Sequence, residues 1–331
     1  MGRQWSPDDV LGMARSYQSA CVLTAAADLD VFSVLSSGER TASSLASELG
    51  TDLRATAVLL DALAAMGLLE KRGSKYSTPS DVAEILTATG SQNVLPMVRH
   101  QANCLRRWVQ LPQVVQSGKP AQRTPSLRGE AADQAAFIGA MHTVSGPIAE
   151  KLVAQLGPPR FHHLLDVGGA SGTWTIAFLR AMPDATATIF DLPDVIPLAR
   201  KRIADAGMTE RVTLSAGDFY IDPLPIGADF AWLGAIAHQN SREQNRELYA
   251  KIHKALVDNG TLMIRDAVMD DDRTAPPTGA MFAINMLVAT AGGGTYTFDE
   301  YHEDLHTTGF KDIKLLIHDE FMNSVVRANK P

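Results

Sequence analysis

The first candidate for a functional site in this sequence is a glycine-containing turn. Acidic residues follow it at intervals along the chain. The turn reads D-V-G-G-A-S-G over residues 166–172 and closes the apolar run 161–167. A glycine turn between a strand and a helix lets a ligand approach the backbone, and the N-terminus of the helix attracts negative groups. We therefore expect a ligand to bind beside this turn.

Two further acids stand at the ends of the next apolar runs. Asp191 follows the run 186–190, where it could accept hydrogen bonds from ribose hydroxyls, and Asp218 follows the run 211–215. Phe219 comes next and could cover an adenine ring. Each acid alone could be a helix cap or a turn residue. Three acids at successive strand ends beside a glycine turn favour a ligand that contains a nucleoside.

The nicotinamide-cofactor pattern G-x-G-x-x-G is the rival interpretation of the glycine turn. In both possible frames, other residues replace the second and third glycines: Ala170 and Thr173, or Ser171 and Trp174. The turn therefore does not fit that class of cofactor.

The elements that position these residues alternate between strand and helix. Apolar runs suited to strands recur with helical stretches between them, at 161–167, 186–190, 211–215, 228–235 and 261–268. This rhythm predicts an α/β fold with a doubly wound, Rossmann-like parallel sheet. Ligands of such sheets bind at the carboxyl ends of the strands, where the glycine turn and the acids stand.

The first half of the chain is instead predicted to be helical. Apolar residues keep helical spacing over 10–35, and Thr41 can cap a short helix that Gly50 ends. A second short helix over 52–66, with Val58, Leu59, Ala62, Leu63 and Met66 on one face, precedes two short strands at 68–71 and 75–78. This is the winged-helix order.

A winged helix raises the possibility of a DNA-binding regulator. A helix that reads DNA needs basic or amide side chains, yet Arg54 is the only cation in 52–66. We therefore interpret residues 1–156 as a helical, winged-helix-like dimerisation domain and residues 157–331 as the ligand-binding domain. The boundary is set by Gly157-Pro158-Pro159.

Length and composition agree with this organisation. At roughly 150 residues per domain, a chain of 331 residues accommodates two domains. A net charge of −7 argues against a nucleic-acid partner, and no apolar run is long enough for a membrane span. Only Cys21 and Cys104 occur, which excludes a disulfide framework. We expect a soluble, cytoplasmic protein.

Taken in order, six segments resemble the S-adenosylmethionine-dependent O-methyltransferases of small molecules. They are LLDVGGASG, FDLPDVI, RVTLSAGDFY, LGAIAHQNSREQN, NMLVATAGGGTYTFDEY and HTTGF. The resemblance is to the homodimeric type of plant phenolic and hydroxyindole methyltransferases and of bacterial pigment and polyketide pathways. It covers nearly the whole chain, because those enzymes also begin with a winged-helix dimerisation domain.

The resemblance implies a set of site residues. In S-adenosylmethionine, the methionine part would contact Gly168, and its carboxylate would contact Ser145. The ribose would contact Asp191. The adenine would contact Leu192, Asp218 and Phe219. His238 stands where the family places its general base.

The case for His238 also rests on chemistry. His238 follows the apolar strand 229–237, so it stands at the ligand edge of the sheet. Phenol ionises near pH 10, and an imidazole with a pKa near 6.5 can accept its proton while the C–O bond forms. Asp266 ends the next strand and could orient the imidazole and stabilise its cation.

The chain departs from the family at two positions. A basic residue is common four positions before the histidine, and here it is Gly234. Plant enzymes carry a second acid where this chain has Thr295. The sequence leaves open what replaces the basic residue, and whether Asp266 assists His238 alone.

The residues of the acceptor pocket are predicted less specifically than those of the cofactor site. Met141 and Met286 resemble methionines that clamp flat substrates in the family, although methionine at helical spacing also suits a plain core. Further candidates for the lining are Trp108, Phe137, Met281, Phe282 and Asn285. The mixture indicates a planar, mostly apolar acceptor.

One motif suggests different chemistry. Residues 302–306 read H-E-D-L-H, a match to the H-E-x-x-H zinc motif with Glu303 as a general base. We interpret it instead as an exposed helix entered at Thr297 and ended by Gly309, and we expect no metal.

The resulting hypothesis is a homodimer that methylates a hydroxyl of an aromatic or polyketide-like small molecule, with no nucleic-acid or membrane partner. Methyl transfer to carbon or nitrogen on the same scaffold is the alternative enzyme. The alternative that is not an enzyme is a regulator that binds the cofactor without catalysing a reaction. The identity of the acceptor stays open.

Overall fold

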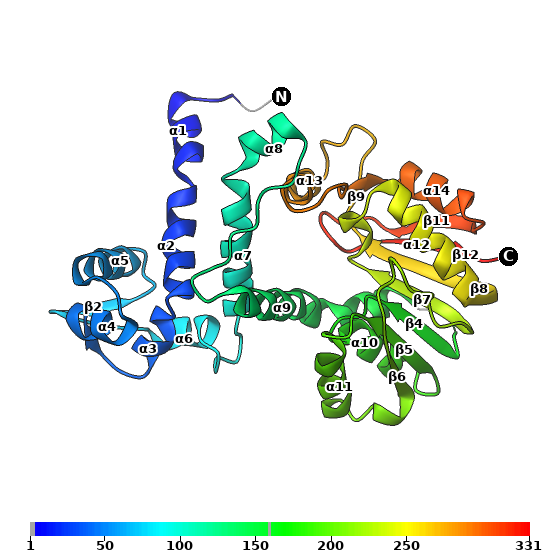
Figure 1. Ribbon diagram of the computed structural model, residues 1–331, viewed down its shortest axis with the longest axis horizontal. Coiled ribbons are helices and arrows are strands. Elements are labelled where there is room, and N and C mark those ends of the chain that lie inside the picture. The colour runs from blue at the N-terminus through cyan, green and yellow to red at the C-terminus, as the bar shows by residue number, and fades with distance from the viewer. Residues whose placement is uncertain (1–3, 158–159) are drawn as a thin grey trace. The chain divides into compact units, whose positions relative to one another are not determined.

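The computed structural model describes residues 4–157 and 160–331 (Figure 1). The chain divides into two compact units. Unit 1 comprises Met1–Arg106 with Arg123–Thr143, and unit 2 comprises Arg107–Gln122 with Val144–Pro331. Pro158 and Pro159 of the expected boundary lie outside the described residues.

Unit 1 begins with three helices where one helical stretch was expected: α1 (Pro7–Arg15), α2 (Tyr17–Asp28) and α3 (Val31–Ser36). The helix α4 (Ala42–Leu49) is capped by the Thr41 hydroxyl, which accepts from the Ser44 N–H, and it ends at Gly50 in a left-handed conformation. Both signals confirm the prediction made for this helix, because a hydroxyl at the N-cap and glycine at the C-terminus satisfy backbone groups that the helix leaves unpaired.

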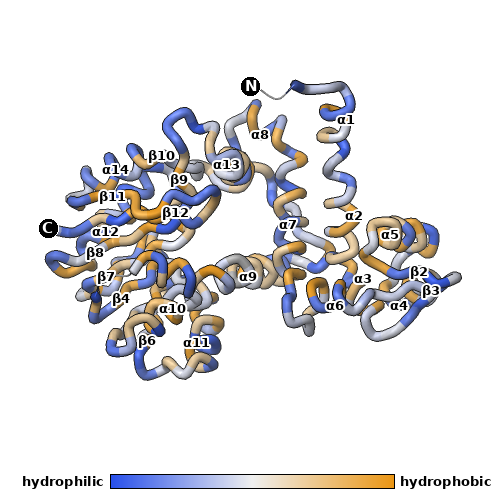
Figure 2. The backbone as a smooth tube through the Cα atoms, turned by 180° about the vertical axis from the view of Figure 1, so that it is seen from behind, coloured by the Kyte–Doolittle hydropathy of each residue, from blue (hydrophilic) through white to orange (hydrophobic). Residues whose placement is uncertain are grey.

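The winged-helix order is confirmed by the elements that follow. The helix α5 (Leu53–Ala65) precedes the strands β2 (Glu70–Arg72) and β3 (Lys75–Ser77), and β1 (Arg40–Thr41) pairs with β3. The wing strands are hydrophilic and coloured blue in Figure 2.

The residues expected to share one face of α5 differ in burial. Leu63 is buried with Thr56 and Leu60, whereas Val58 and Met66 are exposed. The helix is apolar around most of its circumference, so hydropathy alone does not select the face that meets the core of unit 1.

The rest of the helical half contains α6 (Ser80–Leu86), α7 (Leu95–Trp108), α8 (Leu111–Ser117) and the long helix α9 (Glu130–Leu156). Residues from 144 onward in α9 belong to unit 2. Within the described residues, no helix is both long and apolar enough to cross a membrane.

Unit 2 is built around a seven-stranded sheet in the order β11-β12-β8-β7-β4-β5-β6. Its strands are β4 (His163–Val167), β5 (Thr186–Asp191), β6 (Val212–Ala216), β7 (Ala228–Gly234), β8 (Leu256–Asp266), β11 (Lys311–Ile317) and β12 (Ser324–Asn329). Strands β4 to β8 are parallel, as expected for the Rossmann-like sheet. Strand β12 runs antiparallel to both of its neighbours, β11 and β8. The connection from β11 to β12 is too short to hold a crossover helix, so the chain reverses direction between them.

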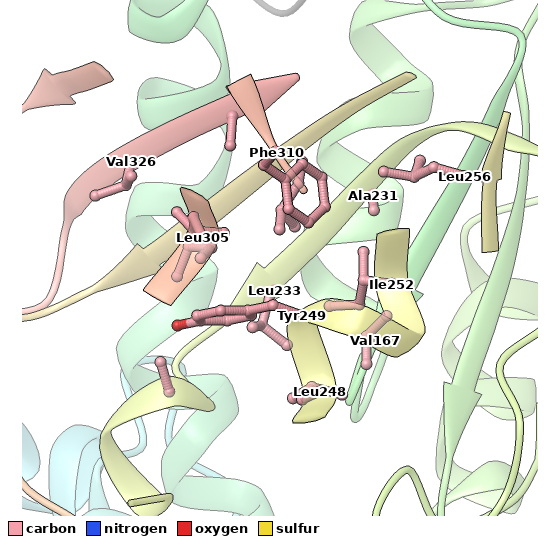
Figure 3. Close-up of a cluster of buried hydrophobic side chains, with 14 of the residues drawn as sticks. Val167, Ala231, Leu233, Leu248, Tyr249, Ile252, Leu256, Leu305, Phe310 and Val326 are labelled. Carbon is pink, nitrogen blue, oxygen red and sulfur yellow. The ribbon is translucent and has the colours of Figure 1, made fainter. Parts of the chain in front are cut away.

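Helices cover both faces of this sheet. Buried residues of α9, α10 (Thr173–Ala181) and α11 (Ile196–Asp205) pack on one face. Buried residues of α12 (Arg242–Ala255) and α14 (Phe298–Thr307) pack on the other, where Tyr249, Leu305 and Phe310 meet strand side chains such as Leu233 (Figure 3). Two cores back to back keep the sheet rigid, and its carboxyl edge carries the candidate site.

Smaller elements complete the unit. The 3-10 turn η1 (Thr209–Arg211) precedes β6 at its amino end. The other small elements are the 3-10 turn η2 (Ala237–Gln239), the helix α13 (Pro277–Ala289), and the paired short strands β9 (Val268–Met269) and β10 (Tyr296–Thr297).

Candidate active site

The glycine turn after β4 is closed by a carboxylate from the neighbouring strand. The N–H of Ala170 donates to Asp191 Oδ2 at 2.7 Å, and the N–H of Leu192 donates to Asp191 Oδ1 at 2.7 Å. Burial raises the pKa of Asp191, and these two hydrogen bonds oppose the rise. Asp191 is thus held at the ligand edge, while the Leu192 side chain is exposed.

Gly168 packs closely against two side chains of the neighbouring loops. Its φ is +68°, and a Cβ there would lie 2.7 Å from Ile236 Cδ1 and 3.7 Å from Phe219 Cε1. Only glycine adopts this conformation readily and avoids the collision with Ile236. The turn therefore requires glycine at position 168.

Asp166 supports the turn from below instead of facing the ligand edge. Its carboxyl is fully buried and accepts from Thr175 Oγ1 at 2.6 Å. Burial, together with the nearby Asp191 charge, raises the pKa of Asp166 to about 7. Of the three strand-end acids, Asp166 is the one whose side chain lies within the core.

The loop that carries Asp218 and Phe219 is fastened to α12 by a lysine that sequence analysis missed. Lys251 Nζ donates to the carbonyl oxygens of Phe219, Tyr220 and Asp222 at 2.7, 2.9 and 3.1 Å. Asp218 Oδ1 accepts from the Tyr220 N–H within the loop. A cation holding three carbonyls fixes this loop beside the glycine turn.

His238 and Asp266 form a dyad beyond the ends of adjacent strands. The strand expected over 229–237 ends earlier, at Gly234, and His238 lies in the 3-10 turn η2 that follows it, whereas Asp266 is the last residue of β8. His238 Nδ1 lies 2.8 Å from Asp266 Oδ1, and the His238 backbone N–H donates to Asp266 Oδ2 at 3.1 Å. The Asp266 side chain is buried, and the His238 side chain is 13% exposed. The structure therefore brings the two predicted catalytic residues together.

The glycine-rich loop after α13 is packed against the backbone of the histidine. The N–H of Gly294 donates to the carbonyl oxygen of His238 at 2.9 Å, and a Cβ on Gly293 would lie 2.5 Å from that oxygen. Thr295, in place of a second acid, is buried. The loop thus fixes the position of His238 without supplying a carboxylate from position 295.

Several predicted acceptor residues cluster near the dyad in unit 2. The Phe282 ring meets the His238 ring edge-on, with centroids 4.9 Å apart, and Trp108 Nε1 donates to Asn285 Oδ1 at 2.9 Å. On the same helix α13, Met281 is exposed and Met286 is buried.

The remaining candidates lie on α9. Phe137 and Met141 belong to unit 1, where the Phe137 ring lies 5.2 Å from that of His100. Ser145 belongs to unit 2 and is half-buried.

The H-E-x-x-H segment lies on α14, as predicted, with Thr297 as its N-cap. Its histidines are exposed with stacked rings, and Glu303 Oε2 accepts from Arg242 Nη2 at 2.6 Å. Within residues 4–157 and 160–331, no group of three or more potential ligand side chains is placed to hold a metal ion.

A side chain at position 234, where the family pattern has a basic residue, would meet the indole of Trp232. A Cβ on Gly234 would lie 2.6 Å from Nε1 of Trp232, so the indole occupies the space of a side chain at 234. Arg265 pairs with Gly234 across the two strands. A charged residue inside the apolar run 261–268 is the sequence signal that singles out Arg265.

A glycine turn, an acid on the next strand and a His–Asp dyad lie at one edge of a Rossmann-like sheet, the edge at which such folds bind nucleoside cofactors. Comparison with known proteins agrees. Residues 111–311 match the O-methyltransferase domain family, and residues 12–89 match the O-methyltransferase dimerisation domain.

The chain is also similar to named proteins along most of its length. It is 33% identical to 3-hydroxy-5-methyl-1-naphthoate 3-O-methyltransferase of Streptomyces sahachiroi, over 88% of this chain and 86% of that protein. It is 30% identical to the tetracenomycin polyketide synthesis 8-O-methyl transferase TcmO of Streptomyces glaucescens, over 93% and 92%. A solved structure described as PigF with SAH has the same fold, with a TM-score of 0.87, 24% identity, and coverage of 98% of this chain and 100% of that one.

The chain belongs to the O-methyltransferase family. It is an S-adenosylmethionine-dependent enzyme that methylates a hydroxyl of a small molecule, as the resemblance of its motifs implied.

Proposed function

We propose that the enzyme methylates a hydroxyl on a planar, aromatic or polyketide-like acceptor, with His238 as the general base. The observation that carries this proposal is the bond between His238 Nδ1 and the buried Asp266 carboxylate. Because Nδ1 donates to Asp266, the neutral ring carries its lone pair on Nε2. Within the described residues Nε2 makes no hydrogen bond, so it is available to a substrate hydroxyl.

When bound, S-adenosylmethionine supplies an electrophilic methyl group on a sulfonium. His238 Nε2 accepts the hydroxyl proton while the substrate oxygen forms its bond to the methyl carbon and the carbon–sulfur bond breaks. The imidazolium that results is stabilised by Asp266, whose two oxygens hold both the ring and the backbone of His238. The neutral thioether that leaves is S-adenosylhomocysteine.

The residues of the turn fit this cofactor. We assign its methionine part to the backbone of Gly168, and the Asp191 carboxylate, already held by two N–H groups, can accept from ribose hydroxyls. We assign the remaining contacts as Ser145 to the carboxylate, and Leu192, Asp218 and Phe219 to the adenine.

The acceptor class is supported by the side chains near the dyad and by the relatives. Phe282 beside His238 suits the edge of an aromatic substrate. Relatives at 33% and 30% identity are named for a hydroxynaphthoate and for tetracenomycin polyketide synthesis. We propose that unit 2 contributes Trp108, Met281, Phe282, Asn285 and Met286 to the acceptor pocket.

Transfer to nitrogen or carbon is the second candidate. Two relatives at 28% identity are named an N,N-dimethyltransferase and an L-tyrosine C(3)-methyltransferase. Incubation with S-adenosylmethionine and matched hydroxyl, amine and carbon acceptors, followed by mass spectrometry and NMR of the product, assigns the methylated atom. An O-methyl ether supports the proposal, and an N-methyl or C-methyl product overturns it.

We also propose that two copies associate through residues 1–156, the winged-helix half of the chain. The support is the match of residues 12–89 to a dimerisation domain and the exposed apolar side chains of α1, among them Val10, Leu11 and Met13.

The decisive test of the base is His238→Gln, which keeps the size of the side chain and removes the basic nitrogen. Loss of the base should lower kcat by about 10²- to 10⁴-fold, while the Kd for S-adenosylhomocysteine, measured by calorimetry, changes less than about threefold. Unchanged kcat would overturn the role of His238, and absence of binding by the wild type would overturn the cofactor site.

A further inference from the structure

Strand β8 carries a buried cation immediately before the catalytic aspartate. Arg265 is 2% exposed, and its Nε and Nη2 both donate to Asn323 Oδ1, at 3.0 and 2.8 Å. Because neighbouring residues of a strand point to opposite faces, Arg265 faces the side covered by α9 and α10, and Asp266 faces the side of α12. The guanidinium lies over the ring of Trp174, 4.7 Å from its centroid.

No carboxylate forms an ion pair with Arg265 in the described part of the chain. Among residues 4–157 and 160–331, none lies within 4.0 Å of its guanidinium, and Nη1 makes no hydrogen bond. Burial lowers the pKa of Arg265 to about 10, and the more distant charges of Asp266 and Asp319 oppose that change only in part. A buried cation without a directly bonded carboxylate is costly, and an anion bound beside it would offset that cost.

A second buried donor lies on the same face. Trp232 Nε1 is fully buried and has no hydrogen-bond partner in the described part of the chain. Its ring lies 5.1 Å from that of Trp174, the second residue of α10, and Nε1 occupies the space beside Gly234. The N-terminus of α10, whose N-cap Gly172 supplies no side-chain bond, adds partial positive charge.

These groups together fit one carboxylate. We propose that Arg265, with Trp232 Nε1, binds the carboxylate of the methionine part of the cofactor, in place of the cation that position 234 lacks. The inference rests on the proposed cofactor site. The cofactor is favoured over an acceptor carboxylate because Arg265 and Trp174 lie on the face where α10 leaves the glycine turn, whereas His238 and Asp266 lie on the other face.

The test compares two ligands by calorimetry: S-adenosylhomocysteine, and its decarboxylated analogue, which keeps the adenosine, the thioether and the amine. Arg265→Met keeps the length of the side chain and removes the charge. Loss of a charge-assisted bond should weaken binding of S-adenosylhomocysteine by about 10- to 100-fold. The Kd of the decarboxylated analogue should change less than about threefold, because that ligand has no carboxylate to lose.

Two further variants separate a loss of carboxylate binding from a general loss of stability. Trp232→Phe removes the N–H and keeps an aromatic ring, and it should weaken binding of S-adenosylhomocysteine alone. Arg211→Met is the structural control: Arg211 donates to the carbonyls of Leu179, Met182 and Ala185, so its loss should lower Tm without distinguishing the two ligands.

A different pattern would overturn the proposal. Equal losses for both ligands in Arg265→Met would assign Arg265 to the core, and so would unchanged binding of both. If Arg265→Met does not fold, the ratio of the two Kd values in Trp232→Phe decides. Failure of the wild type to bind either ligand would instead overturn the cofactor site itself, so the two failures are distinguishable.

Discussion

His238 is held by Asp266 at two points, because one carboxylate oxygen accepts from the ring Nδ1 and the other accepts from the backbone N–H. The ring is therefore fixed in position and in tautomer by a single buried side chain. A carboxylate that acts only as a structural anchor would tolerate replacement by an amide, whereas one that stabilises an imidazolium would not.

The first prediction follows from that difference. Asp266→Asn should lower kcat by about 10²-fold or more, because an amide can still hold the backbone N–H but cannot stabilise the imidazolium. Asp271→Asn, an exposed carboxylate beyond the same strand, is the matched control. An Asp266→Asn enzyme with wild-type kcat would contradict the dyad.

The second prediction concerns the glycine turn. Gly168→Ala adds a Cβ against Ile236 at a positive φ, and Gly207→Ala adds one at φ +69° with no atom within 4 Å. Both variants should lose about 1–2 kcal/mol of stability from backbone strain. Only Gly168→Ala should also weaken S-adenosylhomocysteine binding, by at least tenfold (on the order of 1.4 kcal/mol). Equal binding in both variants would show that the ligand does not approach this turn.

The third prediction tests the loop of Phe219. Lys251→Met removes the ammonium that holds three carbonyl oxygens, so the loop should loosen and adenosine-containing ligands should bind about tenfold more weakly. Lys254→Met, an exposed lysine of the same helix, should have no effect. Hydrogen exchange of the amides at 218–222 provides a readout independent of ligand, and unchanged protection would refute the role of Lys251.

The fourth prediction links Asp166 to pH. Its pKa is raised to about 7 in the fold, so the folded state binds a proton that the unfolded state releases near pH 3.8. Stability should therefore fall as pH rises from about 4 to 7 and level off above, by at most about 4 kcal/mol. Asp166→Asn, which can still accept from Thr175, should remove this slope in urea unfolding at pH 5 and pH 8. A slope that survives in the variant would assign it to other groups.

The fifth prediction concerns association. The mass measured by sedimentation equilibrium should be twice the 35.6 kDa of one chain. Leu11→Glu with Met13→Glu places charges among the exposed apolar side chains of α1 and should raise the dissociation constant of the dimer by at least about tenfold. Leu127→Glu changes a more exposed leucine, at 85%, and should leave the mass unchanged. A wild-type monomer would contradict the proposed homodimer.

Much of this arrangement was predictable from sequence because it depends on local signals. Thr41 and Gly50 mark the ends of α4, and the D-x-G-G-x-S-G turn marks the start of α10. His238 and Asp266 meet because parallel strands bring their carboxyl ends to one edge, which the strand–helix alternation already implied.

The rest depended on packing that a single sequence does not encode locally. The buried face of α5 could not be selected among its many apolar residues, and the role of Lys251 depends on three carbonyl oxygens 29 to 32 residues away. Asp166 was grouped with the ligand-edge acids because sequence position gives a strand end but not the direction of a side chain.

The indole of Trp232 also constrains how this site could change over generations. A lysine introduced at position 234 would collide with Nε1, so that substitution alone should cost about 1–3 kcal/mol of stability through overpacking. Shortening Trp232 first would open a hole beside Trp174 and leave Arg265 without part of its packing. We therefore expect the residues at positions 232, 234 and 265 to change together during evolution. A protein with only one of these substitutions should be less stable than a protein with none or with all of them.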